Sequence, residues 1–256
     1  MGVTVLIFIA FTFCIALTNA GITRIVGGYD APMYFGRFHA SLQNITGHHV
    51  CGGAVVSRYH IVTAAHCVLG AEPQYIKAVV GTANLDDGGI QHDVCSINIH
   101  KEYNFTARIN DIALIKVKQP FDLKYTDVLT LYETELVEGD EVILSGFGAR
   151  KPNGESSRIM HKLTLPVFSQ ETCRFAMRYT RNVTERMFCT FTRIGEGTCH
   201  GDSGGPLVKN YQLVGLVSWG IPCAVGFPDV HTRITPYVTW INEQTKYANC
   251  YWEMPC

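Results

Sequence analysis

The sequence is poor in charge, and its charges nearly cancel. Charged residues make up 17% of the 256 positions, and 21 basic against 22 acidic side chains leave a formal net charge of −1. Such a balance gives no reason to expect nucleic acid or an anionic membrane as a partner. Few charges and 11% aromatic residues predict a well-packed globule instead of a disordered chain. The length allows one large domain or two small ones.

Long hydrophobic runs are scarce as well. The longest apolar stretch, Val3 to Leu17, is followed by Thr18-Asn19-Ala20 and is shorter than the roughly 20 residues that span a bilayer. A short apolar segment closed by a small residue is typical of a secretory signal peptide, here 1–20. A membrane anchor is the alternative, which the length disfavours. We therefore expect a secreted, extracellular protein.

The ten cysteines show no Cys-x-x-Cys spacing, so they do not indicate a zinc site. Their number fits an oxidising compartment in which disulfides form. Cys14 lies in the predicted signal peptide, which leaves nine. Three Asn-x-Thr triplets, beginning at Asn44, Asn104 and Asn182, are candidate glycosylation sites in a secreted chain.

Long stretches of helical periodicity are also missing. Short apolar runs separated by glycine, asparagine and aspartate predict antiparallel strands, in two groups. The runs are 40–43, 54–57, 61–64, 76–80 and 112–117, and then 141–145, 162–167, 187–190, 206–208, 212–219 and 230–233. A polar crossover at 119–134 separates the groups, and residues 235–247, with Pro236 near their start, are predicted to form a terminal helix. Composition and pattern alone support an all-β fold.

One glycine-rich stretch, 201–206, carries a candidate nucleophile, Ser203. A serine hydroxyl needs a base to take its proton and donors to hold the negative oxygen of a tetrahedral intermediate. The flanking glycines suit a tight, exposed loop. His66 follows an apolar run and Asp111 begins another, so a base and a carboxylate are available. Taken singly, a core histidine, a strand-end cap and a loop hydroxyl are the alternatives.

These motifs and their order resemble the chymotrypsin-fold (S1) serine endopeptidases over nearly the whole chain after residue 24. The motifs are Arg24-Ile25-Val26-Gly27-Gly28, Cys51-Gly52-Gly53, Ala64-Ala65-His66-Cys67, Asp111-Ile112-Ala113-Leu114, Gly201-Asp202-Ser203-Gly204-Gly205-Pro206 and Ser218-Trp219-Gly220. The resemblance implies two six-stranded antiparallel Greek-key β-barrels and a C-terminal α-helix. It places the barrels at about 25–118 and 135–235 and the helix and tail at 236–256, within one peptidase domain, 25–256.

The resemblance also implies the catalytic roles. His66 would accept the proton of Ser203 and return it to the leaving amine, and Asp111 would orient the imidazole. Backbone N–H groups of Gly201 and Ser203 would form the oxyanion hole, and Ser218 would support Asp111.

Three disulfides follow from the same resemblance: Cys51–Cys67, Cys173–Cys189 and Cys199–Cys223. The cysteines at 95, 250 and 256 have no partner in the family pattern. A tether from Cys95 to Cys250 or Cys256 is favoured, with free thiols or local pairing as alternatives. An odd count leaves one thiol over.

Residues 21–24 resemble a short propeptide, which predicts a zymogen. A trypsin-like activating protease would cut after Arg24 and free an α-ammonium on Ile25. Asp202 is then expected to pair with this ammonium inside the protein instead of taking part in catalysis, because a buried carboxylate needs a partner.

The expected substrate pocket comprises Gly197 at its base and, around it, Thr198, Ser218, Trp219, Gly220 and Asp229. Glycine at the base predicts a chymotrypsin-like preference for cleavage after aromatic residues or leucine. Asp229 stands where the family usually has glycine, a combination that resembles invertebrate collagenolytic serine proteases of broad specificity. Secondary cleavage after lysine or arginine is therefore expected. Alternatively, Asp229 points away or pairs with His231.

The resemblance predicts no cofactor and no metal, since Thr82 stands where calcium-binding members have a first carboxylate in a loop matching 82–92. Polypeptide substrates, serpins or other protein inhibitors are the expected partners of a monomer, with no nucleic acid or membrane. A digestive, venom-like or broad extracellular role is favoured. A narrow-specificity regulatory protease and a catalytically silent binding homologue are the alternatives.

Overall fold

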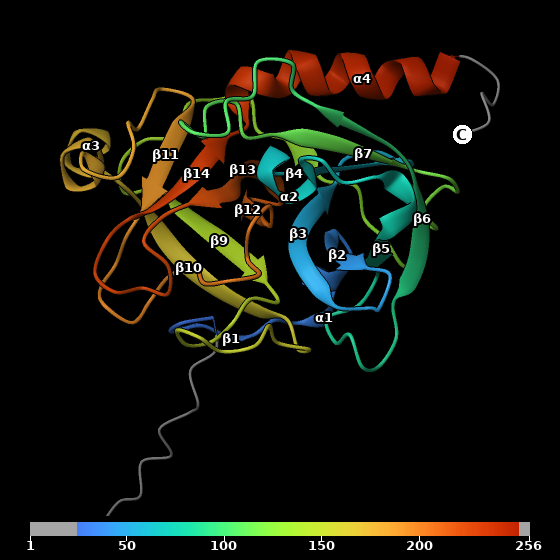
Figure 1. The fold of residues 1–256 in the computed structure, drawn as a ribbon, viewed down its shortest axis with the longest axis horizontal. Coiled ribbons are helices and arrows are strands. Elements are labelled where there is room, and N and C mark those ends of the chain that lie inside the picture. The colour runs from blue at the N-terminus through green and yellow to red at the C-terminus, as the bar shows by residue number, and fades with distance from the viewer. Residues whose placement is uncertain (1–24, 251–256) are drawn as a thin grey trace, which may run out of the picture.

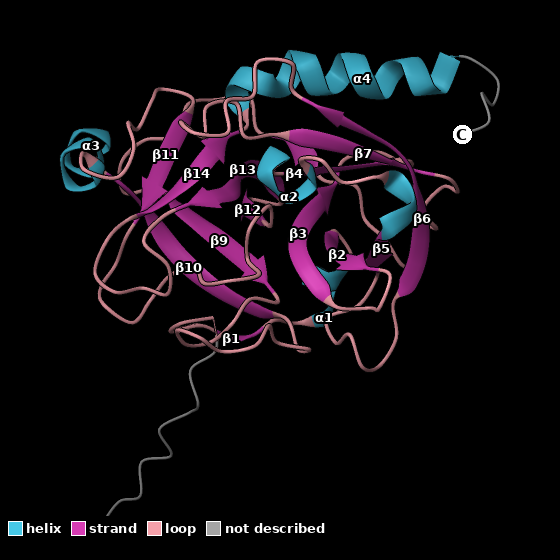
Figure 2. Ribbon diagram, viewed as in Figure 1, coloured by secondary structure: helices cyan, strands magenta, loops and turns pink. Residues whose placement is uncertain are grey.

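Two β-barrels lie side by side, and a C-terminal helix begins above the second barrel and extends over the first (Figures 1 and 2). The computed structural model describes residues 25–250, with side chains described as far as Lys246. The expected signal peptide, the propeptide with Arg24, and Cys256 lie outside the described residues, as does the side chain of Cys250. The predicted class of two six-stranded antiparallel barrels with a terminal helix is confirmed.

The first barrel closes in the strand order β2-β3-β4-β7-β6-β5, with every neighbouring pair antiparallel. Its interior is filled by apolar side chains such as Val55, Ile61 and Ile115, each fully buried. The strands are β2 His39–Asn44, β3 His49–Val55, β4 His60–Thr63, β5 Ile76–Val80, β6 Ile90–Ile99 and β7 Ala113–Val117.

The second barrel runs β9-β10-β11-β14-β13-β12 and closes where β12 and β10 both pair with β9. Two short strands extend it: β1 pairs with β10, and β8, in the crossover, pairs in parallel with β13. The strands are β1 Tyr29–Asp30, β8 Thr130–Leu131, β9 Glu141–Gly146, β10 His161–Phe168, β11 Met187–Thr190, β12 Pro206–Lys209, β13 Gln212–Trp219 and β14 Asp229–Arg233.

Helices are few and mostly short. Pro236 sits in the opening turn of the terminal segment, where its fixed φ suits a helix start. The sequence patterns did not indicate α3, which Ser169 caps by accepting a hydrogen bond from Thr172 N at 3.3 Å. The helices are α1 Met33–Gly36, α2 Ala65–Val68, η1 Pro73–Tyr75, α3 Gln170–Met177, η2 Thr235–Tyr237 and α4 Val238–Cys250.

One apolar cluster joins both barrels to the terminal helix. Phe38 and Leu114 of the first barrel meet Phe147 and Leu216 of the second, and Ile241 of α4 packs against the same cluster. Burying a side chain of this size contributes about 1.5–3 kcal/mol. The cluster therefore fixes the relative position of the two barrels, between which the candidate site lies.

The structure corrects two strand expectations. A strand was expected at 54–57, whereas β3 begins at His49 and ends at Val55. Gly52 and Gly53 do not form a turn but lie within this strand, where other segments approach the backbone closely. A Cβ at Gly52 would lie 2.6 Å from Gly205 Cα, and one at Gly53 would lie 2.6 Å from an Ile61 methyl carbon. The apolar runs also omitted β6, whose ten residues alternate between buried and exposed positions over only part of its length.

Among the described residues, no helix is long and apolar enough to cross a membrane.

Candidate active site

His66 and Asp111 form a bonded pair at the junction of the barrels. Asp111 Oδ2 lies 2.7 Å from His66 Nδ1, and Asp111 Oδ1 accepts from the backbone N of His66 at 2.9 Å. Ser218 Oγ donates to the same Oδ2 at 2.5 Å, and the Asp111 side chain is fully buried. Three donors therefore hold the carboxylate. With the Nδ1 hydrogen directed at Asp111, Nε2 of His66 is left as the proton acceptor.

Two elements position this pair. β4 leads into α2, the single turn that carries His66, while Asp111 lies directly before β7, and β4 and β7 are neighbours in the first barrel. Ser218 comes from β13 of the second barrel. Thr232 of β14 also donates to the Asp111 carbonyl at 2.9 Å. The pair is consequently fixed by both barrels.

Ser203 lies on a turn between the barrels. Its carbonyl accepts from Gly52 N of β3 at 2.8 Å, and the next residue, Gly204, donates to Val217 O at 2.8 Å. A Cβ at Gly204 would lie 2.2 Å from Thr63 Oγ1, so the turn packs tightly against the segment that leads into His66. The positive φ of Gly204, 73°, also favours glycine.

The turn offers unused backbone donors. Asp202, Gly204 and Gly205 donate their N–H groups to backbone carbonyls, whereas those of Gly201 and Ser203 have no acceptor within residues 25–246. Two free N–H groups, one of Ser203 itself and one two residues before it, are the kind of donors that a developing oxyanion requires.

His49, which no sequence motif indicated, holds the same turn in place through a hydrogen bond to its backbone. Its Nε2 donates to the Gly201 carbonyl at 2.9 Å, and its Nδ1 accepts from Ser41 Oγ at 2.8 Å. Burial lowers the pKa of His49 to about 4, so the ring is neutral at physiological pH. The only sequence signal is its position two residues before Cys51, which by itself indicates no role.

Asp202 is fully buried behind this turn and points away from solvent. Its Oδ1 accepts from Gly148 N at 2.9 Å and its Oδ2 from Cys199 N at 3.0 Å. Burial raises the pKa of its carboxyl to about 7, although both hydrogen bonds oppose the rise. Among the described residues, no positively charged side chain forms an ion pair with this carboxyl.

The start of the described chain lies beside Asp202. Ile25 is fully buried, and Val26 packs against Ala149 and Cys199. Cys199 donates to the Asp202 carboxyl, and Ala149 follows Gly148, the other donor. Val26 O also accepts from Gly197 N at 3.0 Å, which links this segment to the expected substrate pocket.

Asp229 turns toward the base of the expected pocket. Its Oδ2 accepts from Thr198 N and its Oδ1 from Thr198 Oγ1, each at 2.7 Å. A Cβ at Gly197 would lie 2.6 Å from Asp229 Oδ2, so only glycine leaves room for the carboxylate there. Burial raises the pKa of Asp229 to about 6.

The alternative pairing of Asp229 with His231 is not formed. His231 Nε2 instead lies 2.8 Å from Thr190 Oγ1. Gly220, at the end of β13, completes the surroundings, because a Cβ there would lie 3.1 Å from Asp229 Oδ1. The Asp229 carboxylate thus lies at the base of the expected pocket, next to Gly197 and Thr198.

Three disulfides join described cysteines. They are Cys51–Cys67, Cys173–Cys189 and Cys199–Cys223. The first ties β3 to the turn that carries His66, and the third ties the Ser203 loop to the segment after β13. Closing a loop of this length stabilises a fold by about 3 kcal/mol through the unfolded chain. Cys95 is also disulfide-bonded.

The remaining candidates from the sequence are the three asparagines of the Asn-x-Thr triplets and Thr82. Asn44, Asn104 and Asn182 are exposed, and Asn44 Oδ1 accepts from Thr46 Oγ1 at 2.7 Å. Thr82 Oγ1 closes its own turn by donating to Asn84 O at 2.7 Å. Among the described residues, the metal-capable cluster is Cys51, His66 and Cys67, two of which are spent in a disulfide.

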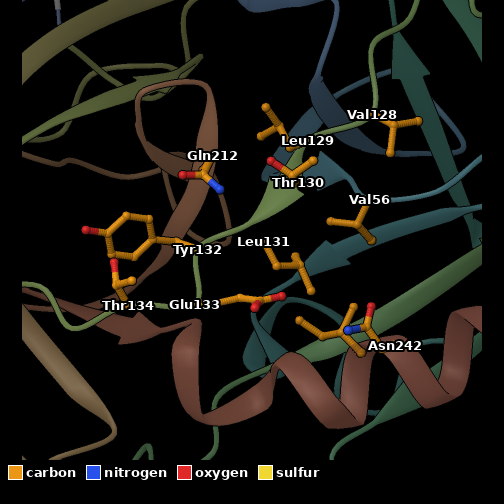
Figure 3. Close-up of a pocket in the computed structure, with 11 residues that line it drawn as sticks. Val56, Val128, Leu129, Thr130, Leu131, Tyr132, Glu133, Thr134, Gln212 and Asn242 are labelled. Carbon is orange, nitrogen blue, oxygen red and sulfur yellow. The ribbon is translucent and has the colours of Figure 1, made fainter.

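A separate cavity of about 520 Å³ lies between the crossover and the terminal helix (Figure 3). Val56, Leu131, Tyr132, Gln212 and Asn242 are among its lining residues. The expected catalytic and pocket residues do not line it.

Comparison with known proteins matches the family model described as Trypsin to residues 25–241. "Chymotrypsin-2" of Vespa crabro is 37% identical over 223 residues, which cover 86% of this chain and 99% of that protein. A "Vitellin-degrading protease" of Bombyx mori is 33% identical, with 87% and 86% covered, and a "Trypsin" of Phaedon cochleariae is 34% identical, with 87% and 89% covered. The match spans both barrels and the site between them, so the chain belongs to the trypsin family of serine endopeptidases.

Proposed function

We propose that the protein is a secreted endopeptidase in which Ser203 attacks the peptide carbonyl and forms an acyl-enzyme. The observation that carries this proposal is the His66–Asp111 pair, to which Ser218 donates a hydrogen bond. The turn that carries Ser203 packs against Thr63, in the segment that leads into His66. His66 Nε2 takes the Ser203 proton, and Asp111 stabilises the imidazolium that results. The free N–H groups of Gly201 and Ser203 receive the oxyanion. Loss of one such donor raises the barrier by about 3–4 kcal/mol.

An acyl-enzyme can be detected directly. A chromogenic ester added to concentrated, activated protein should release a burst of one alcohol equivalent per active site, followed by a slower steady rate. If acylation by the ester is the slow step, alcohol release is linear and shows no burst. Single-turnover mixing then measures the rate of acylation directly. No ester or amide hydrolysis at all would support the catalytically silent homologue instead.

The protein is proposed to be made as a zymogen. A trypsin-like protease cuts after Arg24, and the new ammonium of Ile25 enters beside Asp202, where the buried neighbours of Val26 already lie. The ammonium then neutralises a carboxylate that otherwise has only backbone donors. Pairing orders the turn that carries Gly201 and Ser203.

The preferred residue before the cut bond is proposed to be aromatic or leucine, with secondary cleavage after lysine and arginine. Gly197 and Gly220 place no side chain in the expected pocket, and the Asp229 carboxylate lies next to both of them. Because Thr198 supplies two hydrogen bonds, Asp229 is stable in the empty pocket and can also meet a substrate cation. Serpins or other protein inhibitors would enter the same site, and the protein would act as a monomer.

Asp229→Gly should reduce kcat/KM for cleavage after lysine or arginine by at least about tenfold, which is roughly 1.4 kcal/mol, and spare cleavage after phenylalanine. Asp229→Asn is the control that keeps the shape of the side chain, and it should show the same selective loss. The measurement is kcat/KM on peptides that differ only at the residue before the bond. Equal losses on both substrates, or no basic cleavage by the wild type, would contradict this role for Asp229.

The ratio of basic to aromatic cleavage should also depend on pH. The folded pKa of Asp229 is raised to about 6, so the group is neutral below this pH and negative above it. The lysine-to-phenylalanine ratio of kcat/KM is therefore expected to rise through pH 6 and level off above pH 7. Taking the ratio cancels the titration of groups common to both substrates. A flat ratio from pH 5 to 8 would contradict the assignment.

A further inference from the structure

Arg181 lies beside the Trp219 end of β13, and Arg108 lies in the loop that Arg181 contacts. The guanidinium carbon of Arg181 is 5.6 Å from the centre of the Trp219 ring, and Arg181 Nε donates to Thr106 O at 3.1 Å. The loop after α3 is thereby joined to the loop that precedes Asp111. Arg108 of that second loop donates to Tyr103 Oη at 2.9 Å.

The charges of this arginine pair, Arg108 and Arg181, converge on one phenol. Burial raises the pKa of Tyr103 above its usual value, and the charge of Asp111 raises it further, while both arginines oppose the rise. Arg108 donates to this phenol directly, and Arg181 contacts the loop of Arg108 through Thr106 O. The pair is thus next to the proposed catalytic residues.

Neither arginine is neutralised by a carboxylate of the described residues, whereas nearby Arg174 pairs with Glu185. Two further donors in the same place also lack partners: Arg108 Nε and the indole nitrogen of Trp219 are buried without an acceptor in the part of the chain described. The region is therefore rich in donors and cations and poor in acceptors.

We propose that the arginine pair accepts an acidic side chain of the substrate, two to four residues before the bond that is cut. This rests on the proposed function, which places the residue before the cut bond against Ser218, Trp219 and Gly220. The residues preceding it must then extend past Trp219 toward the arginines. Gly220 N–H, which has no acceptor within residues 25–246, can pair with such an extended peptide.

Arginine suits this role because its planar donors match both oxygens of a carboxylate. Arg108 also holds its backbone in the left-handed region, with φ of 55°, and stacks 4.8 Å from the Phe105 ring. These constraints limit the motion of its guanidinium. Two cations against one peptide segment favour an acidic peptide over a long sulfated polymer, which needs a more extended basic surface.

The test uses peptides with phenylalanine before the cut bond that differ only in glutamate or glutamine at each of the three preceding positions. For the wild type, at least one position should favour glutamate by about fivefold in kcat/KM at low salt. Since partly exposed charges are screened, the preference should fall below about twofold at 0.5 M salt. Titration of Ser203 with a covalent inhibitor normalises each sample to its active fraction.

Arg181→Gln should reduce the glutamate-to-glutamine ratio at least threefold, Arg181→Lys should retain most of it, and Arg181→Glu should favour lysine at the same position. Arg178→Gln is the matched control, because it removes one charge whose guanidinium stacks instead on Phe175 and Tyr179. It should leave the ratio unchanged.

The outcomes separate the two proposals. Equal cleavage of glutamate and glutamine peptides, or an equal effect of Arg178→Gln, would overturn the acidic preference and leave the endopeptidase proposal intact. Inhibition by a sulfated polymer without any peptide preference would overturn it in favour of the polymer. Failure of the wild type to cut any of the peptides would contradict the proposed function itself.

Discussion

Ser203→Ala is expected to abolish amide hydrolysis. Removing the nucleophile of such a site lowers kcat by about 10⁶-fold, because the histidine and aspartate then have no attacking hydroxyl to activate. The measurement is kcat on a peptide amide with the activated variant. The fold should remain, since Ser203 lies on a turn and its carbonyl, not its hydroxyl, makes the contact with Gly52.

The control for this substitution is Ser157→Ala, which removes a hydroxyl whose hydrogen bonds are with the backbone of Ile159, donating to its O and accepting from its N. It should keep the wild-type rate. Asp111→Asn should lose about 10⁴-fold, because an amide would favour the wrong tautomer of His66. Appreciable turnover by Ser203→Ala would contradict covalent catalysis at this residue, whatever Asp111→Asn does.

Arg24→Gln is expected to leave the chain uncut and inactive. Without the Ile25 ammonium, the Asp202 carboxylate keeps only its two backbone donors, and the Gly201–Ser203 turn loses the pairing that orders it. An unpaired buried charge costs about 3–5 kcal/mol, which corresponds to at least about a hundredfold in activity. The measurement is activity after treatment with trypsin, compared with a chain whose position 24 remains arginine.

Asp202→Asn in the cut protein is the companion variant, and it should lose activity to a similar extent while Ser203 and His66 are intact. Lys151→Gln is a control, because the Lys151 side chain is exposed and the variant should keep the activity. Normal turnover by uncut Arg24→Gln would contradict the zymogen switch but not the catalytic mechanism.

The uncut chain should also show a pH signature of Asp202. The folded pKa of about 7 exceeds the ordinary value of 3.8, so the folded state holds the proton more tightly. Stability from this group is full below pH 4 and is lost as pH rises toward 7. Denaturant unfolding of the uncut wild type and Asp202→Asn should show the two diverging over that range. Parallel curves would contradict the buried, unpaired carboxyl.

The sequence indicates candidate residues for the site, but it does not indicate their contacts. Ser203, His66 and Asp111 stand in motifs whose order carries the resemblance, so their positions could be identified without a structure. The pairing of Asp229 with Thr198 could not, because it depends on how a side chain turns within a pocket built from two distant segments.

The local hydrophobic pattern also fails to predict some elements of the fold. β6 alternates polar and apolar residues irregularly, since its face toward solvent and its face toward the barrel interior change along ten residues. His49 shows the same limit at the site: only the closed barrel brings it under Gly201, 152 positions away in sequence. The two arginines likewise come together only because two loops meet beside Trp219, through a contact between residues 75 positions apart in sequence.

Covalent labelling tests the central claim most directly. The activated protein is treated with a serine-directed organophosphate, digested and analysed by mass spectrometry, with His66→Ala treated in parallel. One phosphoryl group per molecule is expected on Ser203, with loss of amidase activity in proportion to labelling and greatly slowed reaction in His66→Ala. Unlabelled Ser203 in a fully active sample, or inactivation that follows labelling of another residue, would contradict the account.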